Sequence, residues 1–356
     1  MNILFVTRKY PPSTGGMEVF SAELYAALTR ARADDIQLYV PTPPIIGRPS
    51  IWQLARFAWG AARAIARPKK RFDAIILGDC LLIPLSLWAR LIHGQTIKII
   101  GTAHGNDIFF AGNTSISSRV YAFALRLFSR HLDLLIANSN TTAEAAKPYG
   151  FRRIEKVSLA TSPQTIASCL TPRPTLLFAG RLIAVKGLSW FIENVLPGID
   201  PQISLLVAGP AWDSEEMKAL NSCDRAHYLG ILDKSELALL RSTVIACIMP
   251  NLPPEISRQN EGFGLSALES PAVGTPVIAT RCGGLAEAVV DGVTGFLIDP
   301  MDSSGFAARV HKIFSWSRED RETFAINARN EIAEHFNWDR VASDYLRLIE
   351  LMEPIK

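Results

Sequence analysis

The stretch from Asn260 to Glu287 constrains the fold of this chain more than any other part. It reads Asn-Glu-Gly-Phe-Gly-Leu-Ser-Ala-Leu-Glu-Ser-Pro-Ala-Val-Gly-Thr-Pro-Val-Ile-Ala-Thr-Arg-Cys-Gly-Gly-Leu-Ala-Glu. Gly262 and Gly264 allow a tight backbone before an apolar helical run, and Gly274-Thr275-Pro276 ends that helix before a strand over Val277–Thr280. The stretch therefore predicts a loop, a helix, a turn, a strand and a second loop, in keeping with an α/β fold.

Two carboxylates bracket the start of this predicted helix. Glu261 lies in the loop before it and Glu269 lies two turns inside it, so a fully helical backbone would put them about 12 Å apart near one face. Each carboxylate could accept hydrogen bonds from the hydroxyls of a separate sugar, while the N–H groups between them attract a phosphate. Taken alone, such a pair is more often two incidental acids on a capped surface helix.

The residues around the pair decide between these interpretations. Glu-Gly-Phe-Gly-Leu, the second Glu, Gly-Thr-Pro-Val-Ile-Ala-Thr and Gly-Gly together resemble the retaining nucleotide-sugar glycosyltransferases of the GT-B fold, specifically family 4. In that family the first Glu contacts donor-sugar hydroxyls and the second holds the ribose, which assigns Glu261 to catalysis and Glu269 to substrate binding. The resemblance also assigns to substrate binding the residues Gly262, Phe263, Gly264 and Leu265. The sequence departs from the family at Ser270–Val273, where Pro271 is expected to kink or shorten the helix.

Length and composition set the domain organisation. A chain of 356 residues exceeds the size at which one hydrophobic core stops growing, so two domains are expected, with a Thr/Ser/Pro-rich linker at Ala160–Pro174. With the resemblance, this predicts two Rossmann-like, doubly wound domains facing across a cleft, at residues 1–165 and 173–337. Residues 338–356 are expected to form a helix that packs back on the first domain, as in GT-B enzymes.

The charge is strongly polarised between the two halves. Residues 1–170 hold 20 Lys and Arg against 10 Asp and Glu, whereas residues 171–356 hold 17 against 24. The five cysteines include no Cys-x-x-Cys pair and are expected to be reduced cytosolic thiols. Met1–Thr7 is expected to be a buried strand and not a signal peptide, and Arg90 interrupts the apolar run at Leu81–Leu91. We therefore expect a cytoplasmic protein that is soluble or peripheral at the inner face of the cytoplasmic membrane.

The first strand leads into a glycine-bearing loop. A strand over Ile3–Thr7, the loop that ends at Gly15 and Gly16, and a helix from Met17 match the phosphate-facing turn of a doubly wound sheet. The loop lacks Gly-x-Gly-x-x-Gly, which weakens a dehydrogenase interpretation. On its own the loop is as well explained by a simple turn that needs glycine. The resemblance implies that Gly15 and Gly16 approach the donor diphosphate and sugar.

A second cluster follows a later strand of the first half. His104-Gly105-Asn106-Asp107 comes directly after the strand Lys98–Ala103, at the edge where open α/β sheets bind ligands. A histidine here could also serve only to cap or turn the chain. The family has His-Gly-x-Asp or a relative at this place, which implies catalytic roles for His104 against the donor sugar and for Asp107 near the acceptor.

The second half opens with two cations after a strand. Arg181 and Lys186 lie in the Gly-Arg-Leu…Lys-Gly segment that follows the strand Thr175–Ala179. Such a pair can hold a diphosphate and stabilise it as it leaves, and the family resemblance supports that role in both catalysis and binding. By the same resemblance, the nucleotide base lies against the loop of Leu229, Gly230, Ile231 and Leu232.

The segment from Gly47 to Phe72 has seven basic residues and no acidic one. A helical stripe of Ile51, Leu54, Ala55, Ala58, Ala62 and Ile65, together with two tryptophans, indicates either an anionic membrane surface as a partner or an ordinary crossover helix whose arginines are solvated. A second basic helix is expected at Ser118–His131.

These features together predict a retaining glycosyltransferase. It would move a hexose from a UDP- or GDP-sugar to a hydroxyl of a saccharide or lipid-linked acceptor, in cell-envelope polysaccharide or glycolipid synthesis. No Asp-x-Asp occurs, so no divalent metal or other cofactor is expected, and no nucleic acid is an expected partner. The alternatives are a nucleotide-sugar epimerase on the same fold and a catalytically silent scaffold in envelope assembly.

Overall fold

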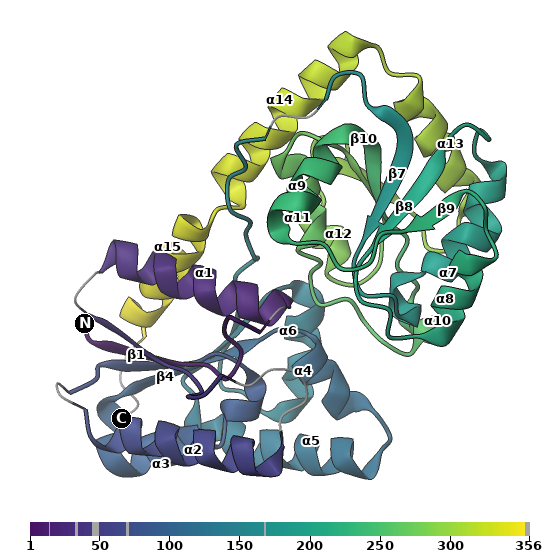
Figure 1. Ribbon diagram of the computed structural model, residues 1–356. Coiled ribbons are helices and arrows are strands. Elements are labelled where there is room, and N and C mark those ends of the chain that lie inside the picture. Colours follow the sequence, from purple (N-terminus) through teal and green to yellow (C-terminus); the bar gives the residue numbers. More distant parts are fainter. Residues whose placement is uncertain (14, 33–34, 45–49, 69–70, 167–168, 353–356) are drawn as a thin grey trace. The chain divides into compact units, whose positions relative to one another are not determined.

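The computed structural model describes residues 1–13, 15–32, 35–44, 50–68, 71–166 and 169–352 (Figure 1). The chain forms two compact units, unit 1 from Met1–Leu159 with Trp338–Lys356 and unit 2 from Ala160–Asn337. Residues 47–49 and 69–70 of the basic segment, and residues 353–356 of the expected terminal helix, lie outside the described residues.

Unit 1 is built on a six-stranded parallel sheet in the order β2-β1-β3-β4-β5-β6. The strands are β1 (Ile3–Val6), β2 (Ile36–Tyr39), β3 (Ala74–Leu77), β4 (Lys98–Ala103), β5 (Leu134–Ala137) and β6 (Ile154–Lys156). The helices are α1 (Gly16–Ala31), α2 (Ile51–Ala66), α3 (Leu85–His93), α4 (Asn106–Phe109), α5 (Ile116–Phe128), α6 (Asn140–Ala146) and α15 (Trp338–Glu350). The inner strands β1, β3 and β5 are continuous, buried apolar runs because helices cover both faces of the sheet, whereas the edge strands β2 and β6 include polar residues.

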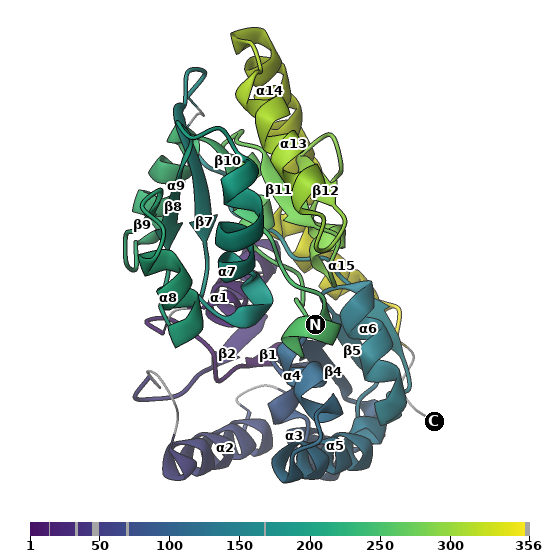
Figure 2. The ribbon, with the colours of Figure 1, turned by 90° about the vertical axis from the view of Figure 1, so that its right-hand side faces the viewer.

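The two faces of this sheet are covered by different helices (Figures 1 and 2). Leu4 and Val6 join one core cluster with residues of α2, α3 and α5. On the opposite face, α1 packs against α15, where Phe20 lies 6.0 Å from the ring of Trp338. The C-terminal helix is therefore part of the core of unit 1, although in the sequence all residues of unit 2 stand between it and the rest of unit 1.

Unit 2 repeats this arrangement with the strand order β12-β11-β10-β7-β8-β9, again all parallel. The strands are β7 (Arg173–Ala179), β8 (Ser204–Ala208), β9 (Ala226–Tyr228), β10 (Val244–Met249), β11 (Val277–Thr280) and β12 (Gly295–Ile298). The helices are α7 (Leu188–Trp190), α8 (Ser214–Asn221), α9 (Lys234–Thr243), α10 (Pro254–Ser257), α11 (Ser266–Ala272), α12 (Leu285–Ala288), α13 (Ser303–Phe314) and α14 (Arg318–His335). The order reverses between β7 and β10, and such a reversal is where doubly wound sheets bind ligands.

One prediction about unit 1, the composition of the buried stripe of the basic helix α2, was wrong in detail. The buried stripe of α2 consists of Phe57, Ala61 and Ile65, whereas Ile51 is exposed. Since α2 has apolar residues on nearly every side, its sequence allows two phases of the stripe, and only packing on the sheet selects the phase that buries the phenylalanine.

Candidate functional site

The site in unit 2 lies at the carboxyl ends of β7 and β10, where the strand order reverses. Arg181 and Lys186 follow β7, and Asn251 and Glu261 follow β10. Parallel strands end at the same edge of a sheet, so segments far apart in sequence converge here. The predicted cations and the first predicted glutamate therefore belong to one site.

Glu261 is the centre of this cluster. Its Oε2 atom accepts hydrogen bonds from the Lys186 ammonium and, at 2.8 Å, from Nδ2 of Asn251. The two charged side chains are only 14% and 16% exposed. Burial acts to raise the pKa of Glu261, but Lys186, Asn251 and the nearby Arg181 together outweigh it and hold that pKa below its usual value. Glu261 is thus an ionised acceptor at neutral pH.

Glycines allow the loops around Glu261 to touch through their backbones. A Cβ atom on Gly284 would lie 2.0 Å from the carbonyl oxygen of Gly262, and Gly284 N–H donates to the carbonyl of Glu261 at 3.0 Å. Across the site, Gly187 has a φ of +68°, and a Cβ there would lie 2.1 Å from the carbonyl oxygen of Pro250. These close approaches fix the loops that carry Lys186 and Glu261.

Glu269 has its own cation. The carboxylate accepts from Nη2 of Arg241, a residue of α9 that is 4% exposed. Glu269 lies inside α11, which starts only at Ser266, so Glu261 precedes the helix and the two glutamates do not share a helical face. Pro271 sits next to the last residue of α11, in agreement with the predicted shortening.

The other expected donor contacts of unit 2 lie in loops around this edge. Arg181 places its guanidinium 5.0 Å from the ring centre of Trp212, which is exposed. Ile231 is also exposed, and Gly230 has a φ of +74° with open space where a Cβ would be. Phe263 is 2% exposed, so its ring is packed in the interior. The same loops contain the remaining predicted residues, Leu229, Leu232, Gly262, Gly264 and Leu265.

In unit 1, the predicted glycine loop ends at the start of α1. Gly15 has a φ of +156°, and a Cβ there would lie 2.5 Å from a carboxylate oxygen of Glu18. Glu18 is buried and pairs with Lys9 at 3.0 Å. Gly16 is the first residue of α1. Glycine is therefore required where the loop folds over the first turn of the helix.

His104 is held on several sides. Its Nε2 atom lies 2.8 Å from the carbonyl oxygen of Gly78, and its ring contacts Phe20 edge-on at 4.6 Å. The carboxylate of Asp107 accepts from the backbone N–H of His104 at 2.9 Å and of Cys80 at 3.2 Å. These contacts favour a role for Asp107 in holding the His104 loop over a role as a free acid that binds substrate.

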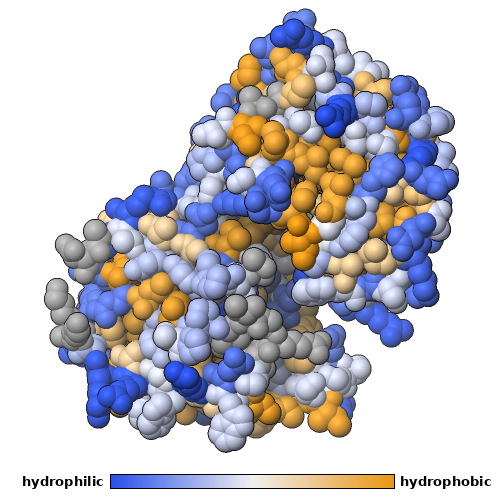
Figure 3. All heavy atoms as spheres, in the orientation of Figure 1, coloured by the Kyte–Doolittle hydropathy of each residue, from blue (hydrophilic) through white to orange (hydrophobic). Residues whose placement is uncertain are grey.

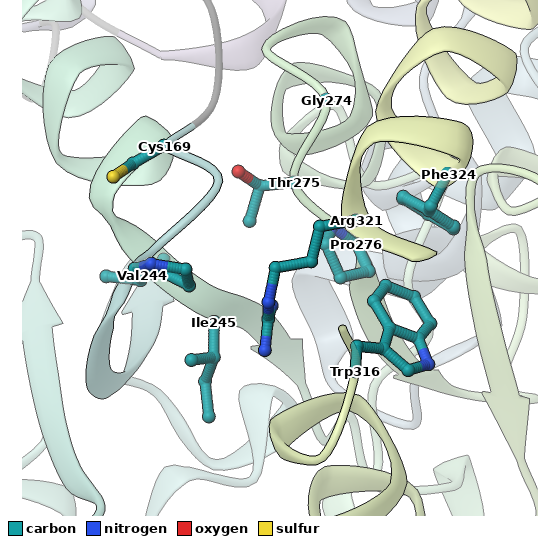
Figure 4. Close-up of a pocket in the computed structure, with 10 residues that line it drawn as sticks. Cys169, Val244, Ile245, Gly274, Thr275, Pro276, Trp316, Arg321 and Phe324 are labelled. Carbon is teal, nitrogen blue, oxygen red and sulfur yellow. The ribbon is translucent and has the colours of Figure 1, made fainter. Parts of the chain in front are cut away.

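Within the described part of the chain, no group of three or more His, Cys, Asp or Glu residues is arranged to hold a metal ion. A pocket of about 10 Å³ in unit 2 lies at the other end of the sheet, where Val244 begins β10 and Pro276 precedes β11 (Figure 4). It is lined by Trp316 and Arg321 and has room for about one water molecule. It is not part of the site at the carboxyl edge.

Both units match known protein families. Residues 173–315 match the family described as "Glycosyl transferases group 1", and residues 14–160 match "Glycosyltransferase Family 4". The chain belongs to glycosyltransferase family 4. The predicted family and its GT-B fold are confirmed.

The chain is also similar to several known proteins and solved structures. A glycogen synthase of Mycobacterium tuberculosis is 32% identical over 47% of this chain, but the match spans only 40% of that relative. N-acetyl-alpha-D-glucosaminyl L-malate synthase of Bacillus anthracis is 24% identical over 94% of this chain and 93% of its own length. The structure of HepE from Anabaena, in complex with UDP and glucose, superposes with a TM-score of 0.74 at 19% identity, covering 99% of this chain and 100% of that one.

Sequence reasoning missed two residues that contact the predicted glutamates of this glycosyltransferase. Asn251 lies two residues after the end of β10, so its place just beyond a strand end was the signal that could have revealed it. Arg241 gave no such signal, because it lies within the helix α9 and reaches Glu269 only through packing of α9 on α11.

Proposed function

We propose that this glycosyltransferase is a retaining hexosyltransferase that uses a UDP- or GDP-sugar as donor. The observation that carries the proposal is the cluster of Glu261, Lys186 and Asn251, with Arg181 beside it, at the switch point of unit 2. It combines an ionised acceptor for sugar hydroxyls with cations for a diphosphate. UDP-sugars are the first donors to test, since HepE, which shares the fold, is described in complex with UDP and glucose.

Each polar residue then has a role in donor binding. Arg181 and Lys186 bind the diphosphate and stabilise the charge that develops on it as it leaves. Glu261 accepts hydrogen bonds from hydroxyls of the donor sugar, and Glu269, oriented by Arg241, accepts them from the ribose. The base lies along Leu229 to Leu232. In unit 1, the backbone at Gly15 and Gly16 and the ring of His104 are proposed contacts of the diphosphate and sugar.

The reaction needs no further charged group. The bond between the anomeric carbon and the diphosphate oxygen breaks through an oxocarbenium-like transition state. The acceptor hydroxyl attacks the same face of the sugar, and its proton passes to the departing phosphate. We expect the cations of the chain to take the place of a metal at the diphosphate.

The acceptor is proposed to be a saccharide or lipid-linked hydroxyl of the cell envelope, met at the cytoplasmic face of the membrane. No helix in the described ranges has the length and apolar character needed to span a bilayer. A lipid-linked acceptor would then be reached from the membrane surface. The basic helices of unit 1 support this location.

The deciding experiment is incubation of the full chain with a panel of UDP- and GDP-sugars, with and without acceptors from an envelope-glycan extract. We expect transfer, with the anomeric configuration of the donor retained in the product by NMR and no loss of activity in excess chelator. Conversion of the donor sugar to its epimer would indicate the epimerase, and no reaction with any donor would indicate the silent scaffold. An inverted product would exclude the proposed chemistry.

A further inference from the structure

Helices α2, α3 and α5 form one layer over one face of the unit 1 sheet (Figures 1 and 2). The central helix α3 forms hydrogen bonds with both neighbouring helices. The indole N–H of Trp88 donates to the carbonyl of Ala62 in α2 at 2.8 Å, and the hydroxyl of Ser86 donates to the carbonyl of Phe128 in α5 at 3.4 Å. The inner side of the layer is packed on the sheet. Its outer side faces away from the protein core.

The outer side of α5 is apolar. Ile116, Val120, Phe123 and Leu127 recur at spacings of four, three and four residues, so they form one stripe along the helix. Their exposed fractions are 82%, 64%, 67% and 37%. The stripe lies opposite the buried residues of the same helix, which include Leu125. α5 thus has one apolar side on the core and a second that no described part of the chain covers.

The outer sides of α2 and α3 continue this surface. On α2, Trp52, Arg56, Trp59 and Arg63 follow one another at the same helical spacing, and the two tryptophans are 84% and 74% exposed. On α3, Leu91 is 69% exposed, and Trp88 and Ile92 are partly exposed. Figure 3 shows hydrophobic residues between hydrophilic ones along the lower edge of unit 1, where these helices run in Figure 1.

The charges on this surface have one sign. None of the three helices contains an acidic residue. Arg56, Arg63, Arg119 and Arg130 are exposed, and none forms an ion pair with any described residue. Exposed Trp, Phe and Leu side chains beside unpaired arginines are typical of surfaces that enter the boundary between lipid headgroups and acyl chains. Among binding partners, anionic lipid supplies both the apolar layer and the phosphate charges.

We propose that the outer face of α2, α3 and α5, hereafter the docking face, lies on an anionic bilayer. Trp52, Trp59 and Phe123 enter the interface, while the arginines bind lipid phosphates. The proposal is independent of the sugar chemistry. The proposed binding is not purely electrostatic, because the tryptophans are exposed and not packed in the core. Part of the binding to anionic vesicles should therefore survive high salt.

The test is flotation of the full chain with phosphatidylglycerol-containing vesicles or with phosphatidylcholine vesicles. Salt is set at about 0.1 M and about 1 M, where the Debye length falls from about 10 Å to about 3 Å. We expect strong flotation with the anionic vesicles at low salt, weak flotation with the neutral ones, and a reduced but measurable anionic fraction at high salt.

Variants of exposed residues separate the two contributions. Arg56→Gln with Arg63→Gln should lower the partition coefficient at low salt about fivefold for each arginine. Trp52→Ser with Trp59→Ser should remove most of what remains at high salt. The matched control is Leu239→Ser with Ile326→Ser, which removes exposed apolar side chains from helices of unit 2 and should leave flotation unchanged.

Three results would overturn the proposal. They are failure of the wild type to float with anionic vesicles at low salt, equal flotation of wild type and docking-face variants, and a wild-type dimer that these variants convert to a monomer without any lipid binding. The last would assign the face to a second copy of the chain. Donor turnover with a water-soluble acceptor, measured without vesicles, reports on the proposed function separately and should be unchanged in every variant.

Discussion

Each of the two glutamates expected from the sequence is bonded to a cation from a different loop or helix. Lys186 binds Glu261 from the loop after β7, and Arg241 binds Glu269 from α9. Removing a cation from such a partly buried pair leaves a carboxylate without its partner, which costs more than the pair itself contributes. Mutation of either cation therefore removes a charge and also changes the position of the glutamate that it holds.

Arg181 differs from Lys186 because its guanidinium lies over the ring of Trp212, 5.0 Å from the ring centre, and acts on Glu261 only through its charge. Arg181→Ala should therefore reduce turnover through the lost charge, by about 2.7 to 4 kcal/mol, or a hundredfold or more, if it acts like other charge-stabilising donors. Steady-state kinetics with the identified donor measure this. Arg318→Ala, an exposed arginine at the start of α14, is the control, and near-normal turnover in folded Arg181→Ala would exclude the role.

Lys186→Met should lower the free energy of unfolding by an amount that depends on pH. The pKa of Glu261 lies below its usual value in the folded wild type, so its stabilising contribution is complete above the unfolded pKa of about 4.3 and is lost as the pH falls through the folded value. Without Lys186, burial dominates and that pKa rises. We expect a loss of roughly 1–3 kcal/mol at neutral pH that shrinks towards acid pH.

Thermal unfolding of wild type and Lys186→Met across the pH range measures this loss. Lys218→Met, which breaks the exposed pair with Glu215, is the control and should cost little at any pH. A loss in Lys186→Met that is constant from neutral to acid pH would show that Glu261 is not the group involved.

At the scale of elements, the site depends on loops whose backbones are in contact. Gly284 has a φ of −67°, so alanine there is not strained by conformation. The added Cβ would nevertheless meet the carbonyl oxygen of Gly262 at 2.0 Å. The turn after β11 must therefore move away from the loop that carries Glu261.

Gly284→Ala should destabilise the chain by about 1–3 kcal/mol, the usual cost of overpacking, and should lower turnover through displacement of Glu261. Gly198→Ala is the matched control, because its Cβ would meet only the Cβ of Ala307, at an ordinary 3.7 Å. Denaturant unfolding and kinetics on both variants measure the two effects. Equal behaviour of the two alanine variants would contradict the packing argument.

At the scale of the whole molecule, the chain closes its first unit with its last helix. Trp338, Tyr345 and Ile349 of α15 are almost completely buried in unit 1. The hydroxyl oxygen of Tyr345 lies 3.4 Å from Oγ1 of Thr102 in β4. Burial of each large side chain contributes about 1.5–3 kcal/mol, so several of them approach the 5–15 kcal/mol that stabilises a whole domain.

A chain that ends at Asn337 should therefore lose the cooperative unfolding of unit 1 while unit 2 still folds. Calorimetry and limited proteolysis detect this as loss of one transition and selective cleavage within residues 1–159. Asp339→Ala, which removes only the exposed ion pair with Arg30, is the control and should cost less than about 1 kcal/mol. A truncated chain with both units intact would contradict the role of α15.

The sequence by itself determined the family, the α/β class and most of the strands. Buried parallel strands are largely apolar runs followed by glycine or polar residues, as in 98–103 before His104 or 277–280 before Arg281. These local patterns also placed Arg181 and Lys186 after a strand and Glu261 in the loop before a helix. Their positions follow from the chain itself, because a strand end and its loop are neighbours in sequence.

Only the tertiary structure decided which groups meet. The pairing of Arg241 with Glu269 and of Asn251 with Glu261 depends on strand order and helix packing, which bring distant segments together without any local pattern. The phase of α2 on the sheet, and therefore the exposure of Trp52, was likewise undetermined, because apolar residues on several sides of one helix can be buried in more than one way. Burial is a property of the neighbours that a residue acquires, and those neighbours are fixed only when the sheet is assembled.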